Sequence, residues 1–346
     1  MSLAPYTAVL FASYGGPRES ADVLPFMRNA TAGKGIPDER LVEVSQHYEL
    51  FGGRSPINEL NEALMQAVSE ELGRRGVTVP VVIGNRNWTP YLRSTVEGLV
   101  DDGHDTVLAL ATSAYASYSS CRQYCEDLEA AREGLEIRID KVDPFAEAPE
   151  FAAANARALV EAVRTLRHQI GDGALRVLFV THSVPTAMNE ASSTGEPAKR
   201  YDAQHLRVAE AVAKAASTEL GETLTWELTF CSRSGSPRTP WLEPDVNDRM
   251  AELSGEGVEG IVAAPIGFIS DHMEVAYDLD TQARETAAEI GLPYQRAATV
   301  GTDAGFVSLI VDRLLERAAI ARGERPDQST CQFSTGRCCL PRPVTS

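Results

Sequence analysis

Two histidines of the sequence lie where apolar strands are predicted to end, which is a place where a side chain can do chemistry. His182 follows the apolar run 176–181, and His272 follows a second such run and precedes Glu274 by two residues. An imidazole and a carboxylate are both acceptable ligands for ferrous iron. The same pair suits general base catalysis near neutral pH. A single strand-end histidine can also be held by a backbone carbonyl alone, so each has a purely structural alternative.

Carboxylates continue from this point along the chain. Glu274 and Asp278 are four residues apart and therefore share one face of a helix, and Glu285 lies three turns below Glu274. One interpretation is a solvated acidic face, favoured by the helix dipole in the first turn. The other is a row of carboxylates that accepts protons or passes a hydrated cation.

Hydroxyl groups form two further candidate sites. Ser55, in the loop Gly52-Gly53-Arg54-Ser55-Pro56, is expected to cap a helix that Pro56 begins. Capping explains this loop completely, but Ser55 and an exposed helix N-terminus could equally bind a ligand carboxylate. The segment 113–124, which ends at Tyr124, is rich in serine and tyrosine and suggests polar anchoring of a ligand.

The elements that position these residues alternate between short β-rich runs and long amphipathic segments. This alternation predicts an α/β fold with parallel sheets flanked by helices. We expect two similar domains, 1–148 and 149–322, followed by the cysteine-rich tail 323–346, which has no apolar periodicity. The predicted strands are 7–13, 79–84, 106–111, 176–181, 223–230 and 260–264, and the clearest helices are 57–75, 149–166 and 203–220.

The two halves of the chain resemble each other. The segment 10–17 (LFASYGGP) is similar to 178–185 (LFVTHSVP), and 89–92 (TPYL) is similar to 239–242 (TPWL). This duplication places Tyr14 and His182 at corresponding points of two domains that face each other across a cleft. Since ligands of open parallel sheets bind beyond the carboxyl ends of the strands, a flat ligand in the cleft could have one of these residues on each face.

Composition excludes several classes of function. The formal charge of −17 argues against binding of nucleic acid or of anionic lipid. The N-terminus resembles neither a signal peptide nor a membrane span, and no segment reaches 18 apolar residues. The expected location is the cytoplasm.

The motifs considered together resemble those of the ferrochelatase family, over the chain up to about residue 322. They are Tyr14-Gly15-Gly16-Pro17, Gly52-Gly53-Arg54-Ser55-Pro56, Thr181-His182-Ser183-Val184-Pro185 and Gly267-Phe268-Ile269-Ser270-Asp271-His272-Met273-Glu274. The resemblance implies a chelatase-type fold of two Rossmann-like domains with the tetrapyrrole between them. It is strongest to the actinobacterial branch, which uses coproporphyrin III.

The resemblance also implies roles for individual residues. His182 and Glu274 match the catalytic and metal-binding pair, with Asp278 and Glu285 as a relay behind it. Three more residues match substrate contacts: Ser55 and Tyr124 at the porphyrin propionates, and Tyr14 on the opposite face of the macrocycle. The basic propionate contacts of the family cannot be assigned residue by residue here.

The implied reaction is insertion of ferrous iron into coproporphyrin III with release of two protons. Protoporphyrin IX is the close variant, and a tetrapyrrole or metal carrier or a cobalt chelatase is the alternative. The sequence contains no G-x-x-x-x-G-K-[ST] segment, which disfavours an ATP-driven chelatase. The expected partners are porphyrin, iron and, transiently, the next enzyme of the haem pathway.

The cysteines suggest an additional cofactor. Cys331, Cys338 and Cys339 crowd the tail, and clustered thiols in a chain expected in a reducing compartment point to metal or redox chemistry. Members of the resembled family carry a [2Fe–2S] cluster, whose irons take four Cys thiolates. Cys121 is the expected fourth ligand because it lies nearer a helix start than the alternative, Cys125. Incidental thiols in a disordered tail are the other interpretation.

Overall fold

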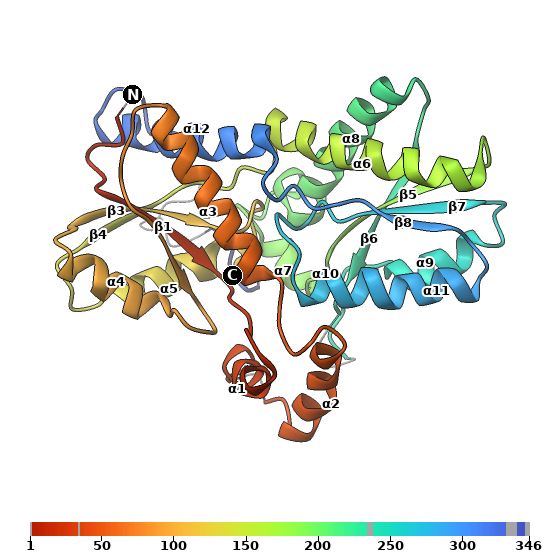
Figure 1. The fold of residues 1–346 in the computed structure, drawn as a ribbon, viewed down its shortest axis with the longest axis horizontal. Coiled ribbons are helices and arrows are strands. Elements are labelled where there is room, and N and C mark those ends of the chain that lie inside the picture. The colour runs from red at the N-terminus through yellow and green to blue at the C-terminus, as the bar shows by residue number, and fades with distance from the viewer. Residues whose placement is uncertain (1, 34, 234–237, 330–337, 343–346) are drawn as a thin grey trace. The chain divides into compact units, whose positions relative to one another are not determined.

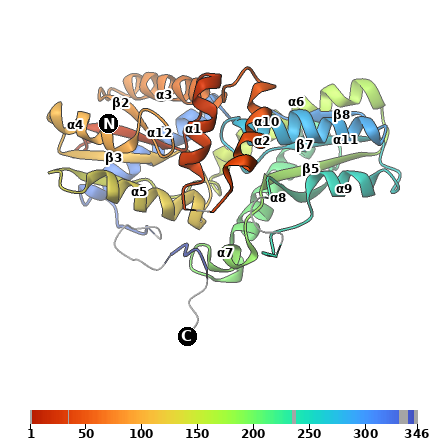
Figure 2. The ribbon, with the colours of Figure 1, turned by 90° about the horizontal axis from the view of Figure 1, so that it is seen from below.

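Each half of the chain contains a parallel sheet covered by helices, which confirms the predicted fold class (Figures 1 and 2). The computed structural model describes the chain except residues 1, 34, 234–237, 330–337 and 343–346. Contacts divide the chain into two compact units. The first is Met1–Pro144 with Val307–Cys339, and the second is Phe145–Phe306 with Leu340–Ser346.

The first unit is built on a sheet of order β2-β1-β3-β4. Its strands are β1 (Ala8–Ser13), β2 (Val81–Asn85), β3 (Thr106–Ala111) and β4 (Arg138–Lys141). Every residue of β1 is buried, as expected for a central strand with both faces covered. Figure 1 shows α4 (Leu92–Asp101) and α5 (Gln123–Arg132) on one side of this sheet, and α3 (Ile57–Arg74) and α12 (Ala304–Ala321) on the other.

A small helical lobe belongs to the same unit. It consists of α1 (Ser20–Ala30) and α2 (Asp38–Glu49), which the sequence patterns did not predict. The two helices share a core of their own around Phe26, Met27 and Leu41. The ring of Phe26 also contacts Tyr14 edge-on, with 6.1 Å between ring centroids, so this lobe packs against the residue that follows β1.

The second unit repeats the topology, with strand order β6-β5-β7-β8. Its central strand β5 (Leu175–His182) is almost entirely buried. Its other strands are β6 (Thr225–Cys231), β7 (Gly260–Ala264) and β8 (Tyr294–Arg296), and its helices are α6 (Pro149–Ile170), α7 (Thr186–Ala191), α8 (Tyr201–Leu220), α9 (Val246–Leu253), α10 (Met273–Tyr277) and α11 (Ala283–Glu289). Helices α9, α10 and α11 share an apolar core with one face of the sheet.

Both units contain a π-helical turn at a matching place. Tyr118–Arg122 lies in the crossover from β3 to β4, directly before α5. Asp278–Gln282 lies in the crossover from β7 to β8, between α10 and α11. Each turn adds one residue to the hydrogen-bonded ring of an α-helix. In the second unit the residues of α11 are therefore rotated relative to those of α10, whereas in the first unit extended Ser117 precedes the turn.

The structure shifts one of the predicted repeat matches. The N–H of Asn85 bonds to the carbonyl of Pro90, and the N–H of Phe230 bonds to the carbonyl of Pro244. Tyr91 and Asp245 then precede α4 and α9. The counterpart of 89–92 is therefore 243–246, four residues beyond the similar letters at 239–242. The stretch at 241 instead forms an antiparallel bridge to Pro185.

The unit boundaries differ from the expected domain boundaries in one respect. The chain passes from the first unit to the second after Pro144, close to the expected boundary at 148. Most of the last helix, α12, however, belongs to the first unit. Arg75 of that unit bonds to Ser308 and Asp312 of α12. Within the described residues, no helix is long and apolar enough to cross a membrane.

Candidate active site

His182 is the last residue of β5 and pairs with Cys231 across the parallel ladder. Its Nδ1 lies close to the carbonyl oxygen of Ser183, which can only accept, so Nδ1 carries a hydrogen. The other ring nitrogen, Nε2, lies 3.5 Å from Glu274 Oε1. The side chain remains 32% exposed and that of Glu274 46% exposed, so both can be reached from solvent.

Charge around His182 favours its protonated form. Burial opposes protonation, but the charge of Glu274, its hydrogen bond and the Ser183 carbonyl outweigh burial and raise the pKa of His182 to about 9. At neutral pH without a metal, the imidazolium and the Glu274 carboxylate therefore form an ion pair. A metal ion arriving at this pair has to displace that proton, because a histidine ligand must be neutral.

His272 lies on the other side of Glu274. It caps α10, where its Nδ1 accepts a hydrogen bond from the Glu274 backbone N–H at 3.1 Å. Its Nε2 is 3.8 Å from Glu274 Oε2. Burial and the charge of His182 lower the pKa of His272, against the opposite pull of Glu274. Glu274 thus lies between one protonated and one neutral imidazole, a division typical of acid–base sites.

Asp278 lies one helical turn after Glu274 and is held by Ser232, the residue that follows β6. The Ser232 hydroxyl donates to Asp278 Oδ2 and also contacts the Cys231 sulfur. Burial raises the pKa of Asp278 to about 6, and the charge of Glu274 adds to this, although the Ser232 hydrogen bond lowers it. Ser232 has a positive φ of 60°, unusual for a residue other than glycine. Ser232 was not identified from the sequence, and nothing in its local pattern marks it.

Glu285 is placed differently from the helical prediction. The spacing assumed one uninterrupted α-helix from 274 to 285, whereas the π-helical turn Asp278–Gln282 interrupts it. The added residue shifts the phase, so α-helical spacing no longer places Glu285 below Glu274 and Asp278. Glu285 is exposed and acts on Tyr277, whose pKa burial raises, with the charge of Glu285 adding to the effect.

The first unit holds the predicted substrate contacts Tyr14 and Ser55. Tyr14 is 38% exposed, which is unusual for a large ring. Ser55 is buried, and its backbone N–H bonds to the carbonyl of Pro17. Helix α3 begins at Ile57, as the range 57–75 predicted, but its N-cap is Pro56 and not Ser55, and Ser55 Oγ reaches the Ile57 N–H only at 3.5 Å. The Ser55 hydroxyl is therefore weakly engaged as a cap.

Tyr124 lies deeper than expected for a ligand contact. Its side chain is buried in the core formed by α4, α5 and the sheet. The guanidinium of Arg86, which forms an ion pair with Asp127, stacks over the Tyr124 ring at 4.2 Å. Burial raises the pKa of Tyr124, and the nearby Arg86 charge and Thr112 hydrogen bond oppose this. Arg86 was not identified as a candidate from the sequence.

Cysteines gather elsewhere in the first unit. Cys121, Cys338 and Cys339 form one buried cluster, while the fourth predicted ligand, Cys331, lies outside the described residues. Cys121 is in a disulfide bond. Among the described residues, no three His, Cys, Asp or Glu side chains are placed to hold a metal ion. The donor chemistry fits an iron–sulfur cluster, but the described geometry is not that of a formed ligand set.

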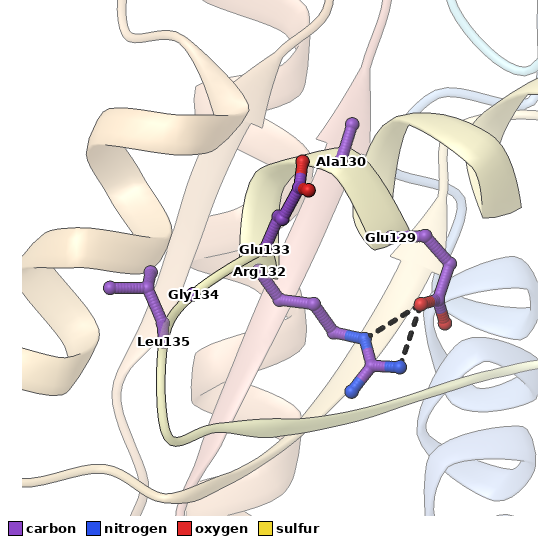
Figure 3. A pocket seen from close by; sticks show the side chains of 6 residues that line it. All are labelled: Glu129, Ala130, Arg132, Glu133, Gly134 and Leu135. Carbon is purple, nitrogen blue, oxygen red and sulfur yellow. Dashed lines mark hydrogen bonds and ion pairs between the residues drawn. The ribbon is translucent and has the colours of Figure 1, made fainter.

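A hollow of about 500 Å³ lies at the C-terminal end of α5 (Figure 3). Six residues line it: Glu129, Ala130, Arg132, Glu133, Gly134 and Leu135. The guanidinium of Arg132 is paired with Glu129, as the dashed lines show. None of the predicted site residues lines this hollow, and we assign it no role.

The comparisons with known proteins show the family of the chain. The ferrochelatase family profile matches residues 6–318, which include His182, Glu274 and Asp278 but not Cys338 and Cys339. The chain belongs to the ferrochelatase family. This confirms the resemblance drawn from its motifs, and it makes the chain a metal chelatase enzyme.

Individual relatives are similar over nearly the whole chain. The coproporphyrin III ferrochelatase of Streptomyces griseus is 49% identical over 92% of this chain and 88% of its own length. That of Leifsonia xyli is 47% identical over 94% of this chain and 87% of its own. Among solved structures, SirB from Bacillus subtilis with Fe3+ is 14% identical with a TM-score of 0.49, covering 94% of this chain and 99% of that one.

Proposed function

We propose that this ferrochelatase inserts ferrous iron into coproporphyrin III and produces Fe-coproporphyrin III (coproheme) and two protons. The observation that carries the proposal is the placement of His182 Nε2 3.5 Å from Glu274 Oε1 at the carboxyl end of the central strand. The names of the relatives from Streptomyces griseus and Leifsonia xyli support coproporphyrin III as the porphyrin.

The site residues suit both parts of the reaction. Ferrous iron accepts imidazole nitrogen and carboxylate oxygen. When the ion binds, it displaces the His182 proton to solvent. When iron passes on to the porphyrin, Nε2 is free again and can accept one pyrrole proton, while Glu274 or Asp278 accepts the second. Asp278, with a pKa of about 6, can bind and release a proton near neutral pH.

The substrate contacts in the first unit remain part of the proposal. We infer that Ser55 binds a porphyrin propionate, because among the described residues its hydroxyl has only a long contact, to the Ile57 N–H. Tyr14 offers an exposed ring for the face of the macrocycle. We also propose that the Tyr124 hydroxyl binds a propionate, and that Arg86, whose guanidinium stacks over the Tyr124 ring, adds a cation that suits a carboxylate.

We further propose that the cysteines of the first unit hold a [2Fe–2S] cluster once Cys121 is reduced. Contact between Cys121, Cys338 and Cys339 supports this, with Cys331 as the remaining ligand. Lys141 supports it independently. Its ammonium is buried 3.6 Å from Cys121 Sγ and bonds to the carbonyl of Val142, and among the described residues it forms no ion pair with a carboxylate. A buried cation requires a compensating negative charge, which thiolates or a cluster would supply.

An anaerobic chelation assay tests the main proposal. Purified protein is mixed with ferrous iron and either coproporphyrin III or protoporphyrin IX, and the metalloporphyrin spectrum is followed. We expect faster conversion of coproporphyrin III. A spectral shift of the bound porphyrin without metal insertion would indicate a carrier, and preference for cobalt in the same assay would indicate a cobalt chelatase. Either result would overturn the proposal.

A further inference from the structure

Behind His182 lies a chain of three buried polar side chains that the proposed chemistry does not use. Thr181 and His205 are fully buried, and Tyr201 is 5% exposed. Thr181 Oγ1 lies 2.8 Å from the Tyr201 hydroxyl and 2.9 Å from His205 Nε2. Buried polar groups without full partners are costly, so the direction of each bond can be worked out.

The direction is set by His205. Its Nδ1 is 2.7 Å from the carbonyl oxygen of Tyr201, which can only accept, so Nδ1 carries the hydrogen. Burial, opposed by this same hydrogen bond, lowers the pKa of His205 to about 3, so the ring is neutral and Nε2 has no hydrogen. Thr181 must therefore donate to His205 Nε2.

The remaining bonds are fixed by this assignment. Because the Thr181 hydrogen is used on His205, Thr181 Oγ1 accepts from the Tyr201 hydroxyl. That hydroxyl has a single hydrogen, which it shares between Thr181 Oγ1 and the backbone carbonyl oxygen of His182, 3.1 Å away. The chain thus reaches the peptide unit of His182 itself, and it does so from α8, the helix that covers this face of β5.

The other side of Thr181 contacts the loop that supplies Glu274. A Cβ added at Gly267 would lie 2.1 Å from Thr181 Oγ1 and 2.8 Å from Thr181 Cα, so only glycine permits this approach. The Gly267 N–H bonds to the carbonyl of Val180 at 3.2 Å. Gly267 begins the segment that continues through His272 to Glu274. Thr181 is thus the point where the β5 end and this loop meet.

We propose that Thr181, Tyr201 and His205 are positioning residues of the reaction. Tyr201 and His205 fix the β5 end through Thr181, and Thr181 in turn packs against Gly267 of the loop, so that the three together set the separation of His182 and Glu274. The inference rests on the proposed roles of those two residues. It assigns no contact with substrate to the three. Their function is to keep two groups from different segments within reach of one metal ion.

The experiment compares two threonines of the same sheet. Thr181→Val deletes the hydroxyl that bonds to Tyr201 and His205 and keeps the side-chain shape that packs against Gly267. Thr229→Val is the matched control, because Thr229 is equally buried and, within the described part of the chain, its hydroxyl bonds only to the carbonyl of Phe179. Tyr201→Phe removes the bond to His182 and keeps the ring. Turnover and KM for ferrous iron and for porphyrin are measured per folded protein, with near-UV dichroism to count the folded fraction.

We expect Thr181→Val and Tyr201→Phe to lower turnover divided by KM for iron by about 10–100-fold, the range typical of lost support behind metal ligands. KM for porphyrin should stay at the wild-type value, and Thr229→Val should keep wild-type kinetics. Wild-type iron kinetics in folded Tyr201→Phe would overturn the inference even if Thr181→Val failed to fold. His182→Ala distinguishes a failure of the proposed function from a failure of the positioning inference. If it is fully active, the proposed roles are wrong, whereas an inactive His182→Ala beside a fully active Tyr201→Phe refutes positioning alone.

Discussion

Glu274 is placed between His182 and His272, with its two carboxylate oxygens 3.5 Å and 3.8 Å from their Nε2 atoms. The two rings come from different segments and differ in charge at neutral pH. One carboxylate can therefore pair with a charged imidazole on one side while a neutral imidazole remains available on the other.

Removing His182 or the charge of Glu274 should abolish most of the activity. We expect His182→Ala to reduce the chelation rate by about 10²–10⁴-fold, the range of a lost general base, and Glu274→Gln to reduce it strongly while keeping the side-chain shape. Rates and far-UV dichroism are measured on the same preparation. A folded His182→Ala protein with wild-type rate would remove this residue from the mechanism.

His182 should stabilise the fold most at low pH. Its pKa is about 9 in the folded protein against 6.5 in an unfolded chain, so the protonated form is favoured by folding. The stabilisation is fully present below pH 6.5 and is lost as the pH rises to 9. Melting temperatures of wild type and His182→Gln are compared from pH 6 to pH 9.5 without iron. A difference that does not shrink with rising pH contradicts the assignment.

His205 should show the opposite dependence. Its pKa is about 3 in the folded protein against 6.5 in an unfolded chain, so between these pH values the unfolded chain binds a proton that the folded protein does not. Its contribution is present above pH 6.5 and is lost as the pH falls toward 3. Below pH 6.5, the melting temperature of the wild type should therefore fall more steeply than that of His205→Gln. Parallel curves for the two proteins would show that His205 is already charged.

Porphyrin anchoring can be tested at Ser55 and Tyr124. Ser55→Ala and Tyr124→Phe should each weaken coproporphyrin III binding by roughly 1.5–3 kcal/mol, as for a hydrogen bond to a charged group. Fluorescence quenching of the porphyrin gives the dissociation constants. Glu97, exposed on α4, offers a surface control through Glu97→Gln. Unchanged affinity in both variants would show that neither hydroxyl contacts a propionate.

The cysteine proposal predicts colour. Protein purified anaerobically with reductant should be reddish-brown and hold about two cluster irons per chain. Cys331→Ser and Cys338→Ser should bleach it, and Cys231→Ser, in the second unit, should not. Lys141→Met should make the reduced cluster harder to form by removing a neighbouring positive charge. Colourless, iron-free protein would refute the cluster and leave the roles of His182 and Glu274 untouched.

Sequence patterns predicted the long elements well. The helices expected at 57–75, 149–166 and 203–220 correspond to α3, α6 and α8, because each has a continuous apolar face. Strands β4 and β8 were missed because they are short and only partly buried, so they carry no apolar run. The repeat match at 239–242 was wrong. Residue similarity alone does not show that the end of β6 bonds to the carbonyl of Pro244, as the end of β2 bonds to that of Pro90.

Within the candidate site, too, the sequence could mark only residues that belong to a local pattern. His182 and Glu274 could be found because strand ends and a family motif mark them. Ser232 could not, because its role depends on a backbone turn and on Asp278 arriving from another segment. The hydrogen bond between Thr181 and His205 could not be predicted either, because two buried residues 24 positions apart become partners only when α8 packs on β5.

The two π-helical turns have different consequences in the two halves. The turn Tyr118–Arg122 is the first turn of its helix, because extended Ser117 precedes it. The turn Asp278–Gln282 instead interrupts a helix, between α10 and α11. Its extra residue takes the side chains of α11 out of the phase that α10 sets. A row of carboxylates counted along the sequence from Glu274 therefore stops at Asp278, and the charge of Glu285 acts on Tyr277 instead.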